Sequence, residues 1–270
     1  MVELENKYQI GVRRFGIINW IGAFSLYKKE VLRFIIVSGQ TLVGPILTSI
    51  LFLVVISLAI GDERPGVLGV PYIEFLANGL IMMQVIQQSF SHSSSSLMMS
   101  KVMGTIVDIV NSPLSAAEVT ISLVLASITR GLCIASISTL IFIFFLDLSI
   151  QNYFLWFLYI FLAGFFLGSV GVIAGLYADK FDQMSTVTNF VIVPLSFLSG
   201  TFYSIEKLPN ILKSLSHYNP FFYMIDGFRY SFIGQSDGSI KFGIIFLLII
   251  SFITWYISYL LFRNGYKIKS

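Results

Sequence analysis

Long apolar stretches alternate with short polar ones along most of the chain. A membrane-spanning helix needs about 20 mainly apolar residues to cross roughly 30 Å of hydrocarbon. Two of the stretches, Thr41–Ile60 and Phe242–Phe262, carry no charged residue at all. The pattern predicts an all-α integral membrane protein with six transmembrane helices, at about Gly39–Gly61, Ile73–Leu97, Val119–Leu146, Tyr153–Tyr177, Val187–Tyr203 and Phe242–Phe262.

Two of the six stretches carry features beyond their length. The second is diluted by Gln84, Gln87, Gln88 and the run Ser93–Ser96, and such polar side chains usually face other helices or a water-filled path. The fourth places four glycines on one helical face, which predicts close packing against another helix of the same chain or of a partner. These glycines are Gly164, Gly168, Gly171 and Gly175.

The segment before the first stretch has the spacing of an amphipathic helix. Its apolar residues recur at helical intervals, and most of them lie away from Lys29, Glu30 and Arg33. The apolar residues are Ile17, Trp20, Ile21, Phe24, Tyr27, Val31 and Phe34. Because a spanning stretch follows almost at once, a helix lying in the cytoplasmic interface is favoured over a soluble helix packed on a partner.

The polar connection Ser100–Ala117 has structure of its own. Lys101–Val110 predicts a short helix with Val102, Ile106, Ile109 and Val110 on one side, and Asn111-Ser112-Pro113 ends it. Ser115 and Glu118 have the spacing of a capping box that would begin the third span. The short helix is either a docking knob in the cytoplasm or a simple connector.

The last connection, Ser204–Gly238, is too long for a tight turn and too polar to cross a membrane. Its apolar residues group into two short stretches separated by Asn219-Pro220, which predicts two short re-entrant helices in the outer leaflet. Asp226 and Arg229 lie three residues apart there, a spacing that allows a local ion pair.

Composition and charge placement support this arrangement. Of the 270 residues, 56% are hydrophobic and 11% are charged, whereas soluble domains carry about 25% charged residues. If the N-terminus is cytoplasmic, eleven Lys and Arg residues lie inside and five outside, so both termini are expected in the cytoplasm. We expect a cytoplasmic segment over residues 1–38 and a transmembrane domain over 39–270, with no separate soluble domain.

Residues that carry chemistry are scarce. The chain has one cysteine, Cys133, and two histidines, His92 and His217, with no metal-binding spacing among them. It also lacks the GxxxxGK[ST] phosphate loop, so it is not expected to be an enzyme or to hydrolyse ATP by itself. Arg130 falls inside the third span, where it would either line a cavity and lock helices or reach back to the cytoplasmic surface.

Several blocks of residues, in order along nearly the whole chain, resemble the ABC-2 type permeases. These are the membrane subunits of bacterial ATP-binding-cassette exporters, and the similarity is greatest to those labelled multidrug exporters. The blocks are Tyr27–Glu30 with Gln40–Pro45, Tyr72–Met83, Ser112–Ser115 with Glu118, Arg130–Cys133, Leu198–Ser204 with Leu208-Pro209, His217–Pro220 and Asp226–Tyr230.

This resemblance implies an assembly of two permease subunits and two ATPase subunits in the bacterial inner membrane. The permease would bind no cofactor, ATP and Mg would be held by the partner ATPase, and no nucleic acid would be involved. An amphipathic connecting helix, a coupling helix at about 100–117 and a re-entrant region at about 204–238 are implied in this chain. A second copy of the chain and the lipid bilayer are its other implied partners.

The resemblance also implies roles for particular residues. Contacts that couple the permease to the ATPase fall on Glu30, Val102, Met103, Ile106, Val107 and Ile109. The translocation path would be bordered by Gln84, Gln87, Arg130, Phe202 and Tyr203, and the re-entrant region carries Asp226 and Arg229. A stand-alone secondary transporter or channel is the alternative, although no row of buried carboxylates favours it. An integral-membrane enzyme is a third possibility, disfavoured by the lack of a convergent acid/base or metal set.

Overall fold

The computed structural model describes residues 18–60, 65–146 and 148–267, and the predicted features at Ile17 and Gly61 lie outside them. The described residues are almost entirely helical, and their one β-bridge joins Val67 to Val70. The α-helices are α1 (Trp20–Ile36), α2 (Gly44–Ile60), α3 (Tyr72–Val102), α4 (Ile106–Asn111), α5 (Ala116–Phe145), α6 (Tyr153–Tyr177), α7 (Phe181–Val187), α8 (Val193–Ser196), α9 (Asn210–Tyr218), α10 (Pro220–Ile233) and α11 (Ile240–Arg263).

Short segments of other helical type connect some of these elements. Three are π-helical: η2 (Gly39–Val43), η4 (Thr188–Ile192) and η5 (Phe197–Thr201). One, η6 (Ile205–Lys207), is a 3-10 turn. A π-helical segment has i→i+5 hydrogen bonds, which enclose one residue more than those of an α-helix. It therefore rotates the side chains that follow it about the helix axis.

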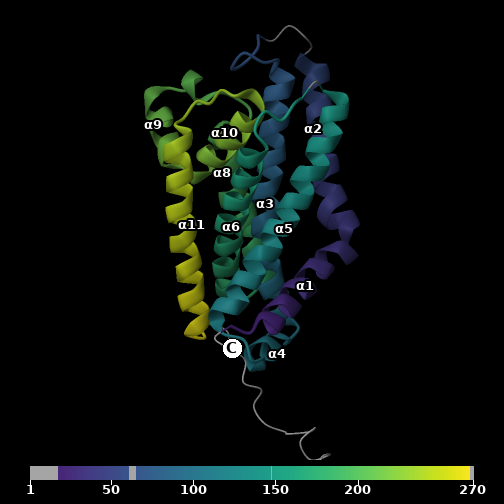
Figure 1. The fold of residues 1–270 in the computed structure, drawn as a ribbon, viewed down its shortest axis with the longest axis vertical. Coiled ribbons are helices and arrows are strands. Elements are labelled where there is room, and N and C mark those ends of the chain that lie inside the picture. The colour runs from purple at the N-terminus through teal and green to yellow at the C-terminus, as the bar shows by residue number, and fades with distance from the viewer. Residues whose placement is uncertain (1–17, 61–64, 147, 268–270) are drawn as a thin grey trace, which may run out of the picture.

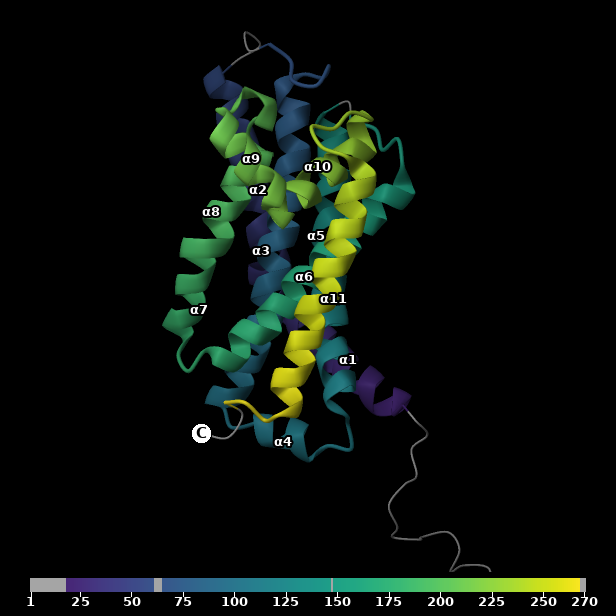
Figure 2. The ribbon, with the colours of Figure 1, turned by 90° about the vertical axis from the view of Figure 1, so that its left-hand side faces the viewer.

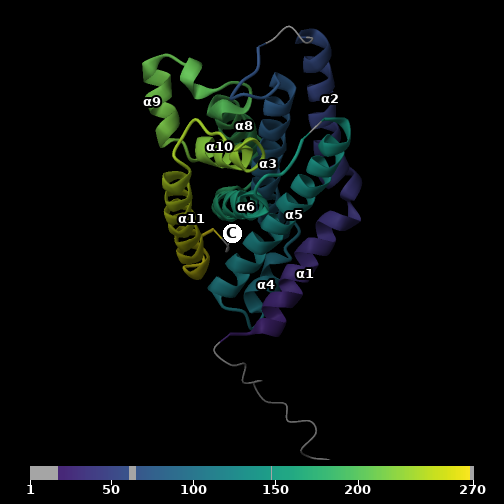
Figure 3. The same cartoon turned by 45° about the horizontal axis from the view of Figure 1, so that its top comes forward.

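Helices α3, α5 and α6 form the centre of the bundle (Figure 1). Helix α11 packs on α6 and α2 packs on α3, on opposite sides of this centre. Helix α4 lies at one end of the bundle, and α9 and α10 lie at the other, so we call these the α4 end and the α9 end. Viewed from the α9 end, α6 lies inside a ring of its neighbours (Figure 3).

The glycine face of α6 explains how tightly the centre packs. A methyl group at Gly164 would lie 2.9 Å from the Ile128 backbone of α5, and one at Gly171 would lie 2.6 Å from the Phe90 carbonyl of α3. The close packing predicted for these glycines is confirmed, and both partner helices belong to the same chain.

Five helices of the described residues are long and apolar enough to cross a membrane. They are Gly39–Ala59, Ala116–Phe145, Tyr153–Tyr177, Phe181–Thr201 and Ile240–Arg263. The second predicted span is also a helix, the 31-residue α3, but its glutamines and serines keep it out of this group. The prediction of six spans is therefore supported for five, and α3 is identified as a buried central helix.

The span predicted at Val187–Tyr203 begins earlier and is less regular than expected. It runs from Phe181 to Thr201 through α7, η4, α8 and η5, and its last turn contains Gly200, whose φ of +81° is left-handed. This irregular helical segment lies at the edge of the bundle (Figure 2).

The connections fold much as the pattern of residues indicates. The capping box at the start of α5 is present, with Ser115 and Glu118 each bonding the other's backbone N–H. Two short helices, α9 and α10, occupy the connection before the last span, as predicted.

Candidate functional site

The hairpin between α3 and α5 forms the α4 end of the molecule. Gly104, with a φ of +73°, turns the chain after α3, and α4 begins two residues later. Ile106 and Ile109 are buried against a cluster that includes Leu123 of α5 and Leu26 of α1. These two side chains anchor α4 to the bundle.

The outward side of the hairpin is apolar as well. Val102, Met103 and Val107 are 58%, 67% and 55% exposed. The six predicted coupling residues therefore lie in different places. The three exposed residues are accessible to a partner. Ile106 and Ile109 are buried and can act only by holding α4 in position.

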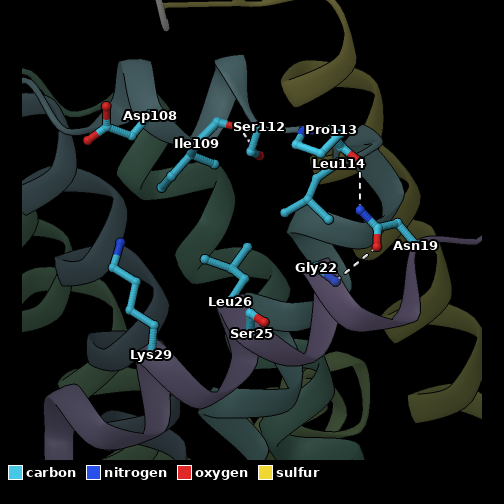
Figure 4. A pocket seen from close by; sticks show the side chains of 10 residues that line it. All are labelled: Asn19, Gly22, Ser25, Leu26, Lys29, Asp108, Ile109, Ser112, Pro113 and Leu114. Carbon is cyan, nitrogen blue, oxygen red and sulfur yellow. Dashed lines mark hydrogen bonds between the residues drawn. The ribbon is translucent and has the colours of Figure 1, made fainter. Parts of the chain in front are cut away.

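A cleft of about 320 Å³ separates α1 from the hairpin (Figure 4). Lys29 of α1 and Asp108 of α4 lie along it, and apolar side chains, Leu26, Ile109 and Leu114, also line it. The α4 end thus presents an exposed apolar helix beside a cleft that carries both signs of charge.

Asn19 closes one end of this cleft and fixes α1 to the hairpin. Its side-chain amide donates a hydrogen bond to the Pro113 carbonyl over 3.0 Å, and its side-chain oxygen accepts one from the Gly22 N–H. The backbone N–H of Asn19 donates to Oε1 of Glu118 over 2.5 Å. One carboxylate therefore caps α5 and holds the start of α1.

Glu30, the remaining predicted coupling residue, lies inside the protein. It is 1% exposed, and its Oε2 accepts hydrogen bonds from Ser96 Oγ of α3 over 2.6 Å and from Arg33 Nε over 3.1 Å. Arg33 also donates to the His92 carbonyl of α3 over 3.0 Å. Residue spacing could not predict the contact with Ser96, because the two residues lie 66 positions apart.

Arg130 lies among helices, where it holds two of them. Its guanidinium donates hydrogen bonds to the Thr41 carbonyl of η2, over 3.2 Å, and to the Gln88 side chain of α3. Arg130 is 6% exposed, which favours the helix-locking alternative over a side chain that reaches water. It joins the first, second and third predicted spans at one point.

The other predicted path residues lie in two groups. Gln84 is buried and Gln87 half-buried on α3. Phe202 and Tyr203 are half-buried after η5, where Phe202 stacks on Phe197 with ring centroids 5.1 Å apart. A separate cleft of about 370 Å³, between α2 and α5, is lined by other side chains, almost all apolar.

Asp226 and Arg229 do not form the predicted ion pair with each other. Arg229 is 1% exposed, lies 3.6 Å from the centre of the Phe75 ring, and donates to the Gly200 carbonyl over 2.9 Å. Asp226 instead accepts hydrogen bonds from the backbone N–H groups of Asp237 and Gly238, each over 2.9 Å. Each side chain holds a different loop onto α10.

This arrangement buries Asp226 as well. Burial raises the pKa of the Asp226 carboxyl to about 6, and the hydrogen bond from Asp237 opposes that rise. Asp237 in turn accepts from Ser204 Oγ over 2.7 Å and from the Ile205 N–H over 3.0 Å. The loops on both sides of α9 and α10 are therefore tied together by two aspartates and one arginine.

No catalytic or metal centre emerges from the residues described. Within 18–60, 65–146 and 148–267, no group of three or more His, Cys, Asp or Glu side chains is placed to hold a metal ion. The features with functional potential are the α4 hairpin, its cleft, and the buried polar contacts that join α1, α3 and α5.

A bundle with five candidate spans and an exposed hairpin at one end defines a multi-pass membrane protein. The family model described as ABC-2 type transporter matches residues 22–233, and the chain belongs to this family. The resemblance seen in the sequence is thereby confirmed.

Individual relatives agree with the family. The chain is 32% identical over 253 residues to the inner membrane transport permease YadH of Escherichia coli strain K12, covering 93% of this chain and 98% of that protein. It is 23% identical over 235 residues to nodulation protein J of Neorhizobium galegae, covering 82% of this chain and 83% of that protein. Both likenesses extend over most of the chain, so it is the membrane subunit of a transporter.

Proposed function

We propose that the chain is the permease subunit of an ATP-driven exporter in the bacterial inner membrane. A separate ATPase subunit holds ATP and Mg, and this chain binds no cofactor. Two copies of the chain form the translocation path, and both termini lie in the cytoplasm with the α4 end. Helix α3 is the sixth span.

The observation that carries the proposal is the construction of α4. Two buried isoleucines fix the helix, while Val107 on α4 and Val102 and Met103 just before it remain exposed. Exposed apolar side chains on a firmly held element are typical of a surface that a partner covers. Since the chain belongs to a transporter family whose membrane subunits work with ATPases, the partner proposed for this surface is the ATPase.

Helix α1 has the exposure expected of a helix at the membrane surface. Trp20, Ile21 and Phe24 are 72%, 75% and 64% exposed and point away from the bundle, whereas Leu26 and Phe34 are buried in it. We propose that the exposed side lies in the lipid interface, with Lys28 near anionic head groups. The re-entrant placement of α9 and α10 in the outer leaflet is proposed from the length and composition of the connection Ser204–Gly238.

The proposed path runs between two copies, past Gln84, Gln87, Arg130, Phe202 and Tyr203. It rests on the position of the glutamines on the central helix and of the two rings just after the candidate span Phe181–Thr201.

Copurification with an ABC-type ATPase from the same bacterium tests the proposal. The wild-type permease is expected to retain the ATPase and to show vanadate-sensitive hydrolysis in lipid. Val107→Asp places a charge on the docking surface and is expected to reduce retained ATPase about tenfold, which corresponds to about 1.4 kcal/mol. Tyr153→Asp introduces the same charge at a position that is 71% exposed in the first turn of α6, away from α4, and is expected to retain it.

Two outcomes would contradict the proposal. One is a wild-type permease that retains no ATPase yet transports in ATP-free liposomes under an ion gradient, as a secondary transporter or channel would. The other is equal loss of the ATPase in Val107→Asp and Tyr153→Asp, because the loss would then have no relation to α4.

A further inference from the structure

Helix α1 is fixed at both of its ends, to different parts of the bundle. At its start, Asn19 bonds Pro113 and Glu118, which belong to the hairpin and to the first turn of α5. Near its end, Glu30 and Arg33 bond α3. Any displacement of the hairpin is thus applied directly to α1.

The contacts along the middle of α1 differ from those to α3. Against α5, α1 makes neutral contacts, such as the Tyr27 hydroxyl to Thr129 Oγ1 over 2.8 Å and Ser122 Oγ to the Ala23 carbonyl over 3.0 Å. Against α3, the polar contacts between described residues are made by two charged side chains, Glu30 and Arg33. Hydrogen bonds to charged groups are roughly twice as strong as neutral ones.

The carboxylate of Glu30 is the centre of the contact with α3. It receives both the Ser96 hydroxyl and the Arg33 guanidinium, and the His92 ring lies 3.9 Å away from it. A carboxylate that is 1% exposed requires such partners, because a buried charge without them is strongly unfavourable. If α1 separates from α3, the carboxylate loses the Ser96 hydroxyl and keeps only Arg33 of its own helix as a partner.

We propose that Glu30 is a positioning residue for transport, which makes α1 and α3 move as one body and so carries displacement of the hairpin to the helix that bears Gln84 and Gln87. The role rests on the proposed function, and it assigns Glu30 to an internal contact in place of a contact with the ATPase. Ser96 and Arg33 are the groups through which it acts.

Distance measurements between α1 and α3 test this role. Spin labels are placed at Leu32→Cys on α1 and Met99→Cys on α3, positions that are 45% and 37% exposed, in a Cys133→Ala background. In the permease–ATPase complex with Glu30 present, the distance is expected to be the same without nucleotide and after trapping with ATP and vanadate. With Glu30→Met, trapping is expected to shift the distance, while ATPase retention stays within twofold of wild type.

Conservative and matched variants separate the role from a general loss of structure. Glu30→Gln keeps an acceptor for Ser96, so trapping is expected to change the distance between α1 and α3 much less than in Glu30→Met. Ser96→Ala is expected to show part of the Glu30→Met shift, whereas Ser95→Ala, which loses a bond within α3 alone, is expected to show none. Lys28→Met is the control on the exposed side of α1.

The inference is overturned if trapping leaves the distance unchanged in Glu30→Met, or if it already shifts the distance with Glu30 present. Loss of ATPase retention in Glu30→Met alone also overturns it, since Glu30 would then contact the ATPase directly. Measurements on the permease without the ATPase distinguish failure of this inference from failure of the proposed function. There, Glu30→Met is expected to broaden the distance distribution, and an unchanged distribution counts against the inference even if no ATPase ever binds.

Discussion

Helices α4 and α10 are short elements at opposite ends of the bundle, and buried charges add to the apolar contacts of α10 alone. Helix α4 is fixed by Ile106 and Ile109 and leaves most of its other side chains exposed. Helix α10 is buried along almost its whole length and is fixed by Asp226 and Arg229. Apolar anchors leave the surface of α4 free to vary with a partner, whereas buried charges commit α10 to one internal arrangement.

The largest effect is expected where the charges of α10 are disturbed. Arg229→Ala frees the carbonyls of Gly200 and Thr201 and removes the cation nearest in sequence to Asp226, which stays buried. Removing one member of a buried charged network typically costs about 3–5 kcal/mol. Thermal unfolding of the purified permease in detergent measures the loss.

Arg263→Ala is the matched control, because Arg263 is exposed at the end of α11 and bonds only the Tyr259 hydroxyl among the described contacts. Its unfolding temperature is expected to match wild type. If both arginine variants lose the same stability, α10 is not held by its charges.

A smaller loss is expected from adding one methyl group to α10. At Gly227, a Cβ atom would lie 1.9 Å from Cζ of Tyr159. The Tyr159 side chain is fully buried, and its hydroxyl donates a hydrogen bond to the Ile240 carbonyl. The ring has no free space to enter, so Gly227→Ala is expected to cost about 1–3 kcal/mol through overpacking. Gly39→Ala meets no atom within 4 Å and serves as the control. Equal unfolding temperatures for the two variants would refute tight packing around α10.

The smallest change in stability is expected on the outward side of α4. Val107 is 55% exposed, so Val107→Asp is expected to alter the free energy of unfolding by no more than about 0.5 kcal/mol. Ile106→Asp buries a charge at a position that is 5% exposed and is expected to unfold at a clearly lower temperature. Comparable losses at the two positions would mean that α4 has no free outer side.

The sequence predicted the helices better than it predicted their faces. The uncharged runs located the first and last spans, and the fourth prediction, Tyr153–Tyr177, coincides with α6. These features depend on local composition. The capping box at Ser115 was equally visible, because both of its residues lie within one turn.

The orientation of α4 could not be obtained in this way. A continuous helix over Lys101–Val110 would place Val102 and Ile106 on one side, but the left-handed turn at Gly104 ends α3 and restarts the helical phase. Val102 is consequently exposed while Ile106 is buried. The left-handed conformation of Gly104 separates the two faces, and a glycine in a loop does not by itself reveal whether it adopts that conformation.

The contacts of buried charges were also beyond local inference. The spacing of Asp226 and Arg229 allowed a pair, but each instead bonds backbone groups outside its own helix, 12 and 29 residues away along the chain. The same holds for Glu30 and Ser96, whose contact depends on how three helices pack. The irregular course of the candidate span Phe181–Thr201, with two π-helical segments, has no marker in the pattern of apolar residues either.

The polarity of α3 has a consequence for how the protein is made. Under the six-span topology, this helix enters the membrane second, yet it is the one whose composition suits lipid least. The helices that bury its serines and glutamines, α5 and α6, are synthesised after it. Its stable integration must therefore wait for downstream segments of the same polypeptide, and a chain truncated before α5 is expected to leave this segment outside the bilayer.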